Sequence, residues 1–537
     1  MGLGTKLGSP RLRRLAFAGL VLAVVVLPTV PTLRRLHSAL RDAPSLGDLA
    51  TEEMGVLEAA QSVRFVGQWS RYGFFQPGPL FFYVMLPAYA VAHFHPWGLS
   101  LGMFLLCWSS TLTICVLAWS QLERWSGAFL AAPAVGATLL YLTTSGNSIL
   151  FNYWTNFAVV LPFGAFLLLA AALAAGELWA MPIVAALLSF LVQTQMATLP
   201  AAAAVTTAAL ALLWRRRRKA PRQPRLKGWI VATVVVGLAA WALPLYGEAV
   251  QRPGNLASIL AFARASHGTH PWSDCFSNWA QLLAGPLTRL ILGLSWQTAL
   301  QGGQLRLAQA LAVSVVALLV IGAALAHRRA HRASEALCIL CALAAASSLW
   351  AIAQIRGELL RYLTLWMAVL GAVACVAILN ETVALVVSRP RRAGRASGDR
   401  LWLLASLLAP GVALLVAAPE PRSPAHPSVT SLHRALEQTL ARTTAPQEQV
   451  RFVSDDFTWP WTSAVATSLK RQGWRPCFDR SLSWVTPWWS CSPRVARSIR
   501  FFEPGKSRSR GQPLFCQPIT PPSLGVEMIC AEQVNGT

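Results

Sequence analysis

Long apolar segments separated by short basic clusters dominate the sequence. A helix needs about 17 to 25 mostly apolar residues to cross the hydrocarbon core of a bilayer. Such spans are predicted at residues 15–30, 99–120, 127–145, 157–175, 178–197, 199–214, 229–246, 306–326, 335–353, 362–382 and 401–418. With 55% hydrophobic and only 13% charged residues, the chain has too few charged residues for the water-exposed surface of a soluble protein of its length. We therefore predict an all-α polytopic membrane protein of about 11 transmembrane helices, the first of them uncleaved.

The basic clusters determine the predicted orientation. The net charge of +24 lies largely in loops between spans, which is typical of cytoplasmic loops and argues against a nucleic-acid partner. The apolar segment 79–94 decides the topology, because counting it as a span would put the basic residues 215–219 outside. As a helix lying on the outer membrane surface, it leaves that cluster inside, with Arg34 and Arg35 as exceptions. The outer face then comprises residues 32–98, the turns 151–156 and 193–196, and residues 247–303.

The first outer segment carries several acids in a chain that has few. Only 22 Asp and Glu stand against 46 Lys and Arg, so carboxylates beside a membrane are informative. Helical spacing over residues 48–63 puts Asp48 and Glu52 on one edge of an apolar stripe and Glu53 on the other. This pattern predicts an amphipathic interfacial helix whose acids face water or a cavity. A solvated loop helix, with acids near the positive end of its dipole, has the same pattern.

Aromatic side chains crowd the second half of this segment, around a turn at Pro77, Gly78 and Pro79. They favour either a platform for a sugar ring or lipid chain, or the aromatic belt that membrane proteins keep at headgroup level. These side chains are Trp69, Tyr72, Phe74, Phe75, Phe81, Phe82 and Tyr83.

The first outer segment carries three motifs: Asp48-Leu49-Ala50 with Glu52, then Gly67-Gln68-Trp69-Ser70-Arg71-Tyr72-Gly73-Phe74, then Pro77-Gly78-Pro79-Leu80-Phe81-Phe82-Tyr83. Together they resemble the first outer loop of bacterial GT-C glycosyltransferases. Matching segments at 253–256 and 356–362 extend the resemblance over roughly residues 10–420, toward a largely uncharacterised bacterial branch. The acid pair and the Pro-rich turn are more distantly similar to protein O-mannosyltransferases and to the aminoarabinose transferases of lipid A.

The resemblance implies a GT-C-like transmembrane domain over residues 1–419 of a protein in the bacterial cytoplasmic membrane. Its expected activity is transfer of a sugar from a polyprenyl-phosphate donor to an acceptor on the extracytoplasmic face. A loop carboxylate would be the general base, with Asp48 first, Glu52 second and Glu53 third. Arg356 and Arg361 would neutralise the departing phosphate. Snorkelling at a helix end is the alternative for both, and it explains Arg361 better than Arg356. The other expected substrate-binding residues are Arg71, Tyr72, Gln76, Trp154, Asn156, Gln193, Gln195, His267 and His270.

The expected partners are the lipid-linked donor and membrane lipids, while the sequence does not identify the acceptor. No metal site is predicted from residue spacing. A divalent cation is left open, because some relatives use one, but one Asp and two Glu residues do not make a clear ligand set.

Three positions depart from the pattern of that branch. Gln76 stands where a His commonly precedes Pro-Gly-Pro, Thr155 interrupts an expected Trp-Asn-Pro, and Gln195 replaces the His of a Gln-Thr-His. The loss of two imidazoles removes proton carriers and leaves hydrogen-bonding amides. Either the acceptor differs or the activity has decayed, and we favour a diverged but active enzyme.

Residues 420–537 change character after a Pro-rich linker and are predicted to form a small extracytoplasmic α/β domain. Short helices are expected at 431–442 and 462–472, with a strand at 451–453. Four cysteines in this segment fit two disulfides, and Cys477–Cys491 with Cys516–Cys530 is the nearest of three pairings. The cysteines expected as core residues of spans are Cys107, Cys115, Cys338, Cys341 and Cys375, whereas Cys275 has no explanation at this level.

Two other functional classes compete with an enzyme. A transporter or flippase of lipid-linked glycans would carry ionisable residues within its spans and broken helices in two matching halves. The predicted spans are almost free of charge at their centres, which favours surface chemistry. A catalytically inactive scaffold would use the outer domain to hold partners, and substitution of Asp48 separates it from an enzyme.

Overall fold

A computed structural model of the chain describes two compact units, each with its own core. The described residues are 45–123, 148–218, 226–251, 254–265, 270–294, 299–387, 427–442, 448–454, 458–478, 489, 491, 497–504, 513–523 and 526–534. Among them, the membrane unit contains residues 104–123 and 148–151 and the described part of 156–387. The α/β unit contains residues 45–103, 152–155 and the described residues after 426.

Seven helices of the described chain are long and apolar enough to cross a membrane, and each coincides with a predicted span. Helix α9 is apolar on every side and buried along its length, as expected for a helix surrounded by others. It packs against α10, α11, α17 and α19. The long helices are α5 (Trp97–Glu123), α9 (Val160–Ala175), α11 (Leu199–Arg217), α12 (Leu226–Val250), α16 (Gly302–Arg328), α17 (Arg332–Ala353) and α19 (Ala368–Val387).

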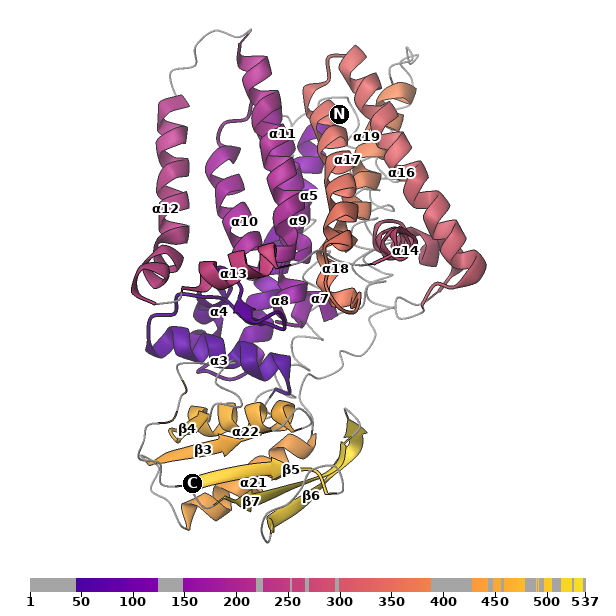
Figure 1. Cartoon of the computed structure of the whole chain (residues 1–537). Helices are drawn as coiled ribbons and strands as arrows, with labels where there is room; N and C mark the ends of the chain where they lie inside the picture. The colour runs from indigo at the N-terminus through magenta and orange to yellow at the C-terminus, as the bar shows by residue number, and fades with distance from the viewer. Residues whose placement is uncertain are drawn as a thin grey trace, which may run out of the picture. The chain divides into compact units, whose positions relative to one another are not determined.

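Helix α12 lies at the edge of the bundle beside α10 (Figure 1). No residue of its apolar window is buried inside the protein, so the side that faces away from α10 is left for lipid.

The predicted span at 178–197 is shorter than expected. Helix α10 (Ala180–Thr194) has 15 residues, or about 22 Å, against a hydrocarbon core of about 30 Å. It begins after a turn at Gly176, whose φ of 113° favours glycine, and ends where Gln195 adopts an extended backbone. Helix α4 (Leu80–Val91) has only 12 residues, which agrees with its prediction as a non-spanning helix. The predicted spans 15–30, 127–145 and 401–418 lie outside the described residues.

Short helices fill the predicted outer loop 247–303. They are α13 (Asn255–Arg264), α14 (Trp272–Leu283) and α15 (Gly285–Leu292). Trp279 attaches α14 to the bundle, because its indole Nε1 donates to the Ala345 carbonyl of α17 at 2.9 Å. Cys275 is fully buried on the same helix, so the cysteine that the sequence left unexplained is a core residue.

The α/β unit combines the first outer segment with the C-terminal segment. Its five-stranded sheet has the order β4-β3-β5-β7-β6, with β3 parallel to both β4 and β5 and the remaining pairs antiparallel. Helices α21 and α22 pack on the sheet (Figure 1). The elements of this segment are α21 (Pro427–Ala441), β3 (Gln449–Val453), α22 (Trp459–Arg471), β4 (Arg475–Phe478), β5 (Arg497–Phe502), β6 (Pro513–Ser523) and β7 (Val526–Gln533).

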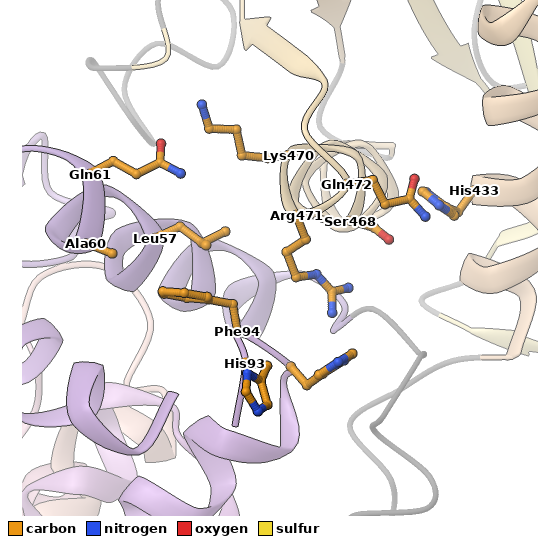
Figure 2. Close-up of a pocket in the computed structure, with 11 residues that line it drawn as sticks. Leu57, Ala60, Gln61, His93, Phe94, His433, Ser468, Lys470, Arg471 and Gln472 are labelled. Carbon is orange, nitrogen blue, oxygen red and sulfur yellow. The ribbon is translucent and has the colours of Figure 1, made fainter. Parts of the chain in front are cut away.

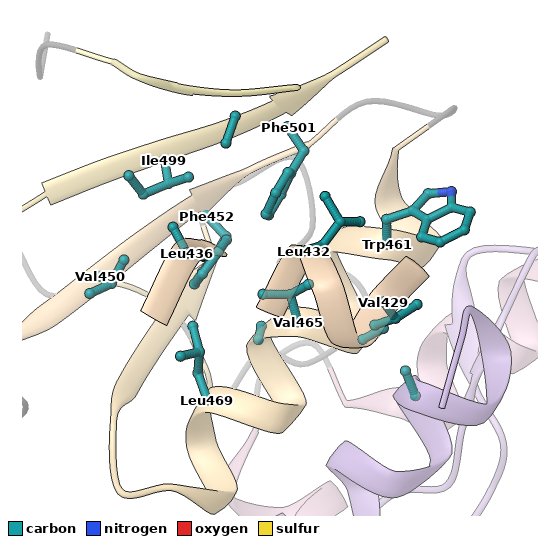
Figure 3. Packing of buried hydrophobic residues seen from close by; sticks show 14 of the residues in the cluster. Val429, Leu432, Leu436, Val450, Phe452, Trp461, Val465, Leu469, Ile499 and Phe501 are labelled. Atoms are coloured by element: carbon teal, nitrogen blue, oxygen red, sulfur yellow. The ribbon is translucent and has the colours of Figure 1, made fainter. Parts of the chain in front are cut away.

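The core of the α/β unit joins residues more than 400 positions apart. Phe452, Phe501 and Leu432 pack together between the sheet and its helices (Figure 3). The same cluster includes Ala50 and Met54, which come from helix α3 (Asp48–Gln61) of the first outer segment. The predicted small α/β domain is therefore present, and its core extends into the acidic helix.

Two disulfides close this unit, in the predicted pairing. Cys477 joins Cys491, and Cys516 joins Cys530 across the β6–β7 pair. Among the span cysteines, Cys107, Cys338 and Cys341 are buried and Cys375 is partly buried, as expected of core residues. The surroundings of Cys115 lie outside the described side chains.

Candidate active site

Helix α3 is buried along most of its length. Residues 50–59 are all buried, since α4 and α22 both pack against α3. Gly55 permits the approach of α4, because a Cβ at this position would lie 2.3 Å from Cε1 of Phe82. The sequence predicted an amphipathic helix whose acids face water or a cavity. Glu52 and Glu53 are both 0% exposed, so the expectation that they face water is wrong.

Asp48 is the exposed acid of this helix. It lies in the first turn, where the partial positive charge of the helix end favours a carboxylate. The start of the helix is anchored, because Gly47, with φ of 62°, donates its backbone N–H to the Pro460 carbonyl at 3.2 Å. Asp48 is therefore an accessible carboxylate on a fixed backbone, and partial desolvation by the surrounding protein raises its pKa above the ordinary value.

Glu52 is a buried carboxyl held by Thr155. Its Oε1 accepts hydrogen bonds from the Thr155 hydroxyl at 2.8 Å and from the Thr155 backbone N–H at 3.3 Å. Its Oε2 has no hydrogen-bond partner among the described residues. Burial raises the pKa of Glu52 from 4.5 to about 8, against the opposing effect of the two Thr155 bonds. Thr155, one of the three departures from the family pattern, therefore contacts the second candidate base directly.

Glu53 holds three elements together. Its Oε1 accepts a hydrogen bond from the Tyr89 hydroxyl of α4 at 2.6 Å and lies 3.4 Å from Nε of Arg471 on α22. Glu53 is 0% exposed and Arg471 is 12% exposed, so this is a largely buried ion pair. Its geometry fits a structural role better than a role as proton acceptor.

A second buried ion pair, between Glu58 and Arg64, was missed by the sequence reasoning. Arg64 also donates to the carbonyls of Val66 and Gly67, both at 3.0 Å, and its guanidinium lies 4.2 Å from the Phe82 ring centroid. Burial raises the pKa of Glu58 to about 7, although Arg64 opposes the shift. Sequence spacing gave no signal for this pair, because Arg64 lies beyond the end of the helix.

The Gly-Gln-Trp motif forms a small hairpin beside α3. Strands β1 (Trp69–Ser70) and β2 (Phe74–Phe75) pair antiparallel, and Gln68 Nε2 donates to the Thr51 hydroxyl of α3 at 2.6 Å. Gln76 closes the hairpin through its backbone, since its N–H donates to the Gln68 carbonyl at 2.8 Å. The motif therefore fixes the hairpin against the acidic helix.

The remaining predicted residues of the α/β unit lie on the same hairpin or on the 152–155 segment. Arg71 is exposed, and its guanidinium lies 5.3 Å from the centroid of the Tyr72 ring. Trp154 is half-buried, and its backbone N–H donates to Asn152 Oδ1 at 2.9 Å. The structure thus brings Asp48, Glu52, Glu53, Arg71, Tyr72, Gln76 and Trp154 into one unit.

The other predicted residues belong to the membrane unit. Asn156 Oδ1 accepts a hydrogen bond from Gln195 Nε2 at 2.7 Å, and both side chains are buried. Gln193 Nε2 donates to the Ala240 carbonyl at 2.8 Å and so joins α10 to α12. Asn156 directly follows Thr155, the residue that bonds Glu52. Gln195, which departs from the pattern of the resembled branch, therefore bonds the chain neighbour of Thr155.

The two arginines differ in their surroundings. Arg356 donates to the Phe262 carbonyl of α13, and its guanidinium lies 4.0 Å from the Phe262 ring centroid. Arg361 is exposed at the start of helix α18 (Arg361–Thr364). His270 is half-buried just before α14, and His267 lies outside the described residues. No group of three His, Cys, Asp or Glu residues in the described part of the chain is arranged to hold a metal ion.

Comparison with known proteins relates the whole fold to a solved structure. No family model matches the chain, and no curated protein matches its sequence. The chain is similar to the crystal structure of ArnT from Cupriavidus metallidurans bound to undecaprenyl phosphate, with a TM-score of 0.53 and 12% identity over 96% of this chain and 98% of that one. The apo structure of the same protein gives a TM-score of 0.51 and 12% identity, over 92% and 94%. At this identity the match establishes the fold, and the predicted GT-C-like architecture is confirmed.

Proposed function

We propose that this protein is a membrane glycosyltransferase that transfers a sugar from a polyprenyl-phosphate donor to an acceptor on the extracytoplasmic face of the bacterial cytoplasmic membrane. The observation that carries the proposal is the shared fold over 96% of the chain with ArnT, whose structure was solved with undecaprenyl phosphate bound. The buried acidic helix in the first outer segment supports it, because a hydroxyl acceptor needs a carboxylate to take its proton.

The proposed general base is Asp48. In the reaction, the acceptor oxygen forms a bond to the anomeric carbon, Asp48 takes the hydroxyl proton, and the bond from the sugar to the phosphate oxygen breaks. Polyprenyl phosphate leaves with the bonding electron pair. Asp48 suits this role because its side chain is exposed at the start of α3.

Glu52 is the second candidate and differs in protonation. With a pKa of about 8, its carboxyl is mostly protonated at neutral pH. A protonated Glu52 held by Thr155 is a poor base. Arg361, exposed at its helix start, is the proposed partner of the departing phosphate, with Arg356 as a second cation.

The test uses the full-length protein in membrane vesicles with a panel of radiolabelled undecaprenyl-phosphate sugars. We expect Asp48→Asn to lower transfer by about 100-fold or more, since positioned general bases contribute 10²–10⁴-fold. Asp274→Asn is the matched control, because Asp274 is also an exposed acid in the first turn of a helix. Transfer by this control should equal that of the wild type.

Glu52→Gln separates the two candidate bases. Glutamine resembles the protonated acid and can still accept the Thr155 hydrogen bonds, so we expect transfer within a few-fold of wild type. If Glu52→Gln abolishes transfer while Asp48→Asn does not, the base is Glu52. Unchanged transfer in both variants would contradict the enzymatic proposal and favour a scaffold.

A further inference from the structure

A cavity of about 600 Å³ lies within the α/β unit, away from Asp48 and Glu52. Its walls come from the C-terminal half of α3, the turn after α4, and helices α21 and α22 (Figure 2). Ligand sites commonly have volumes of about 300 to 1,000 Å³, so a molecule the size of one sugar residue fits.

Among the described residues, the lining of this cavity includes a lysine and an arginine and no carboxylate. Lys470 and Arg471 contribute from α22, and the lining also includes His93, His95 and His433. His433 Nε2 lies 3.5 Å from Oε2 of Glu437 on the same helix. Arg471 extends from α22 toward the turn with His93 and Phe94 (Figure 2). The ion pair with Glu53 balances the charge of Arg471. The excess positive charge of the cavity therefore comes from Lys470.

The turn that carries two of the histidines has a strained backbone. His93 has φ of 53° and Phe94 has φ of 60°, in the left-handed region that favours glycine. The turn is held by hydrogen bonds from the Phe94 N–H to the Tyr89 carbonyl at 2.9 Å and from the His95 N–H to the Ala92 carbonyl at 3.1 Å. Strained backbone conformations of this kind cluster at ligand-binding and active sites. The Phe94 ring on this turn is 39% exposed and packs edge-on against the Tyr89 ring, with the two centroids 5.4 Å apart.

We propose that this cavity binds an anionic sugar residue of the acceptor, carrying a carboxylate or a phosphate group. The cations would pair with the anionic group, since charge-assisted hydrogen bonds are roughly twice as strong as neutral ones. The Phe94 ring, 39% exposed, offers an apolar surface for the face of the sugar ring. The identification of the ligand with the acceptor rests on the proposed function, whereas the binding itself does not.

Equilibrium binding to the full-length protein in phosphatidylcholine nanodiscs tests the proposal. The probes are glucose 6-phosphate, glucuronic acid and glucose, titrated by calorimetry or saturation-transfer NMR. We expect one or both charged sugars to bind at least tenfold more tightly than glucose, and the comparison of the two identifies the anionic group. Equal binding of all three, or no binding, overturns the proposal.

Variants locate the binding in the cavity. Lys470→Gln should weaken binding of the charged sugar about tenfold, while Lys470→Arg should retain it. Arg442→Gln is the control, because Arg442 is an exposed cation at the end of α21 that does not line the cavity. Phe94→Asn should also weaken binding, and asparagine tolerates the left-handed backbone, so the fold is preserved. Wild-type affinity in both Lys470→Gln and Phe94→Asn would overturn the assignment.

Two further results separate this proposal from its alternatives. Asp48→Asn should bind the charged sugar as tightly as the wild type does. If the protein binds the charged sugar but transfers no sugar, the glycosyltransferase proposal fails while the binding proposal for this cavity stands. Replacing the nanodisc lipid by phosphatidylglycerol should not change the affinity. Strong competition by that lipid would overturn the proposal in favour of a lipid headgroup.

Discussion

The ion pair between Glu53 and Arg471 should be the main electrostatic link between the acidic helix and the C-terminal segment. Glu53 is 0% exposed and Arg471 12% exposed, and their closest atoms, Oε1 and Nε, lie 3.4 Å apart. Removing one partner of a buried pair typically costs about 3–5 kcal/mol, because an uncompensated charge stays buried. We predict this cost for Arg471→Gln, where the Tyr89 hydroxyl is the one polar partner of Glu53 Oε1 left among the described residues.

The thermal midpoint of the purified protein measures this cost. For a unit of 150–250 residues, 1 kcal/mol corresponds to about 2–4 °C, so a loss of roughly 3 kcal/mol lowers the midpoint by about 6–12 °C. In the double variant with Glu53→Gln no carboxylate remains to be compensated. The double variant should therefore unfold at a higher temperature than Arg471→Gln alone, with a coupling of about 0.5–3 kcal/mol.

Two results would refute this reasoning. Additive losses in the double-mutant cycle would mean that the two charges do not interact. A midpoint unchanged in Arg471→Gln would mean that Glu53 is hydrated. The control Arg442→Gln, an exposed cation of α21, should leave the midpoint within about 1 °C, because exposed substitutions usually change stability by less than 0.5 kcal/mol.

Three further predictions concern the same unit. Because the pKa of Glu52 is raised from 4.5 to about 8, its protonated form stabilises the fold fully below pH 4.5, and this contribution is lost as the pH rises toward 8. The free energy of unfolding of Glu52→Gln relative to wild type should therefore rise by about 1.4 kcal/mol per pH unit from pH 5 to 8, and the thermal midpoint should rise with it. A constant difference between the two proteins would contradict the shift. Gly55→Ala should cost about 1–3 kcal/mol, since its Cβ would lie 2.3 Å from Phe82, whereas Gly237→Ala, with open space around its Cβ, should cost nothing measurable by the same midpoint. Reduction of the two disulfides, each between cysteines 14 positions apart, should lower stability by about 3 kcal/mol per bond, and a midpoint insensitive to reductant would count against their contribution.

Much of the membrane unit could be predicted from the sequence, because a helix that crosses lipid carries its signal within its own residues. Span 229–246, for example, is α12, and its length and hydropathy need no partner to explain them. The end of α10 was predicted in part. The sequence placed a turn at 193–196 but carried the span to residue 197, whereas the helix ends at Thr194, where Gln195 takes an extended backbone. The prediction of the disulfide pairing is confirmed, because each bridge joins two cysteines that are close in the sequence.

The burial of the acidic helix could not be predicted, because its cause lies far away in the chain. Ala50 and Met54 enter a core with Trp461 and Val465, more than 400 residues later, and Thr467 donates to the Ala50 carbonyl at 3.5 Å. Helical spacing around α3 alone therefore indicated an amphipathic helix. The sequence identified the acids correctly as a cluster but gave no sign that only Asp48 would remain exposed.

The most direct measurement of the central claim is an experimental structure of the full-length protein with bound undecaprenyl phosphate. The account predicts that the phosphate headgroup lies where a sugar attached to it would bring its anomeric carbon next to a hydroxyl within hydrogen-bond reach of the Asp48 carboxylate. A headgroup bound far from Asp48 and Glu52, with neither carboxylate facing it directly or through one water, would contradict the assignment of α3 as the catalytic helix.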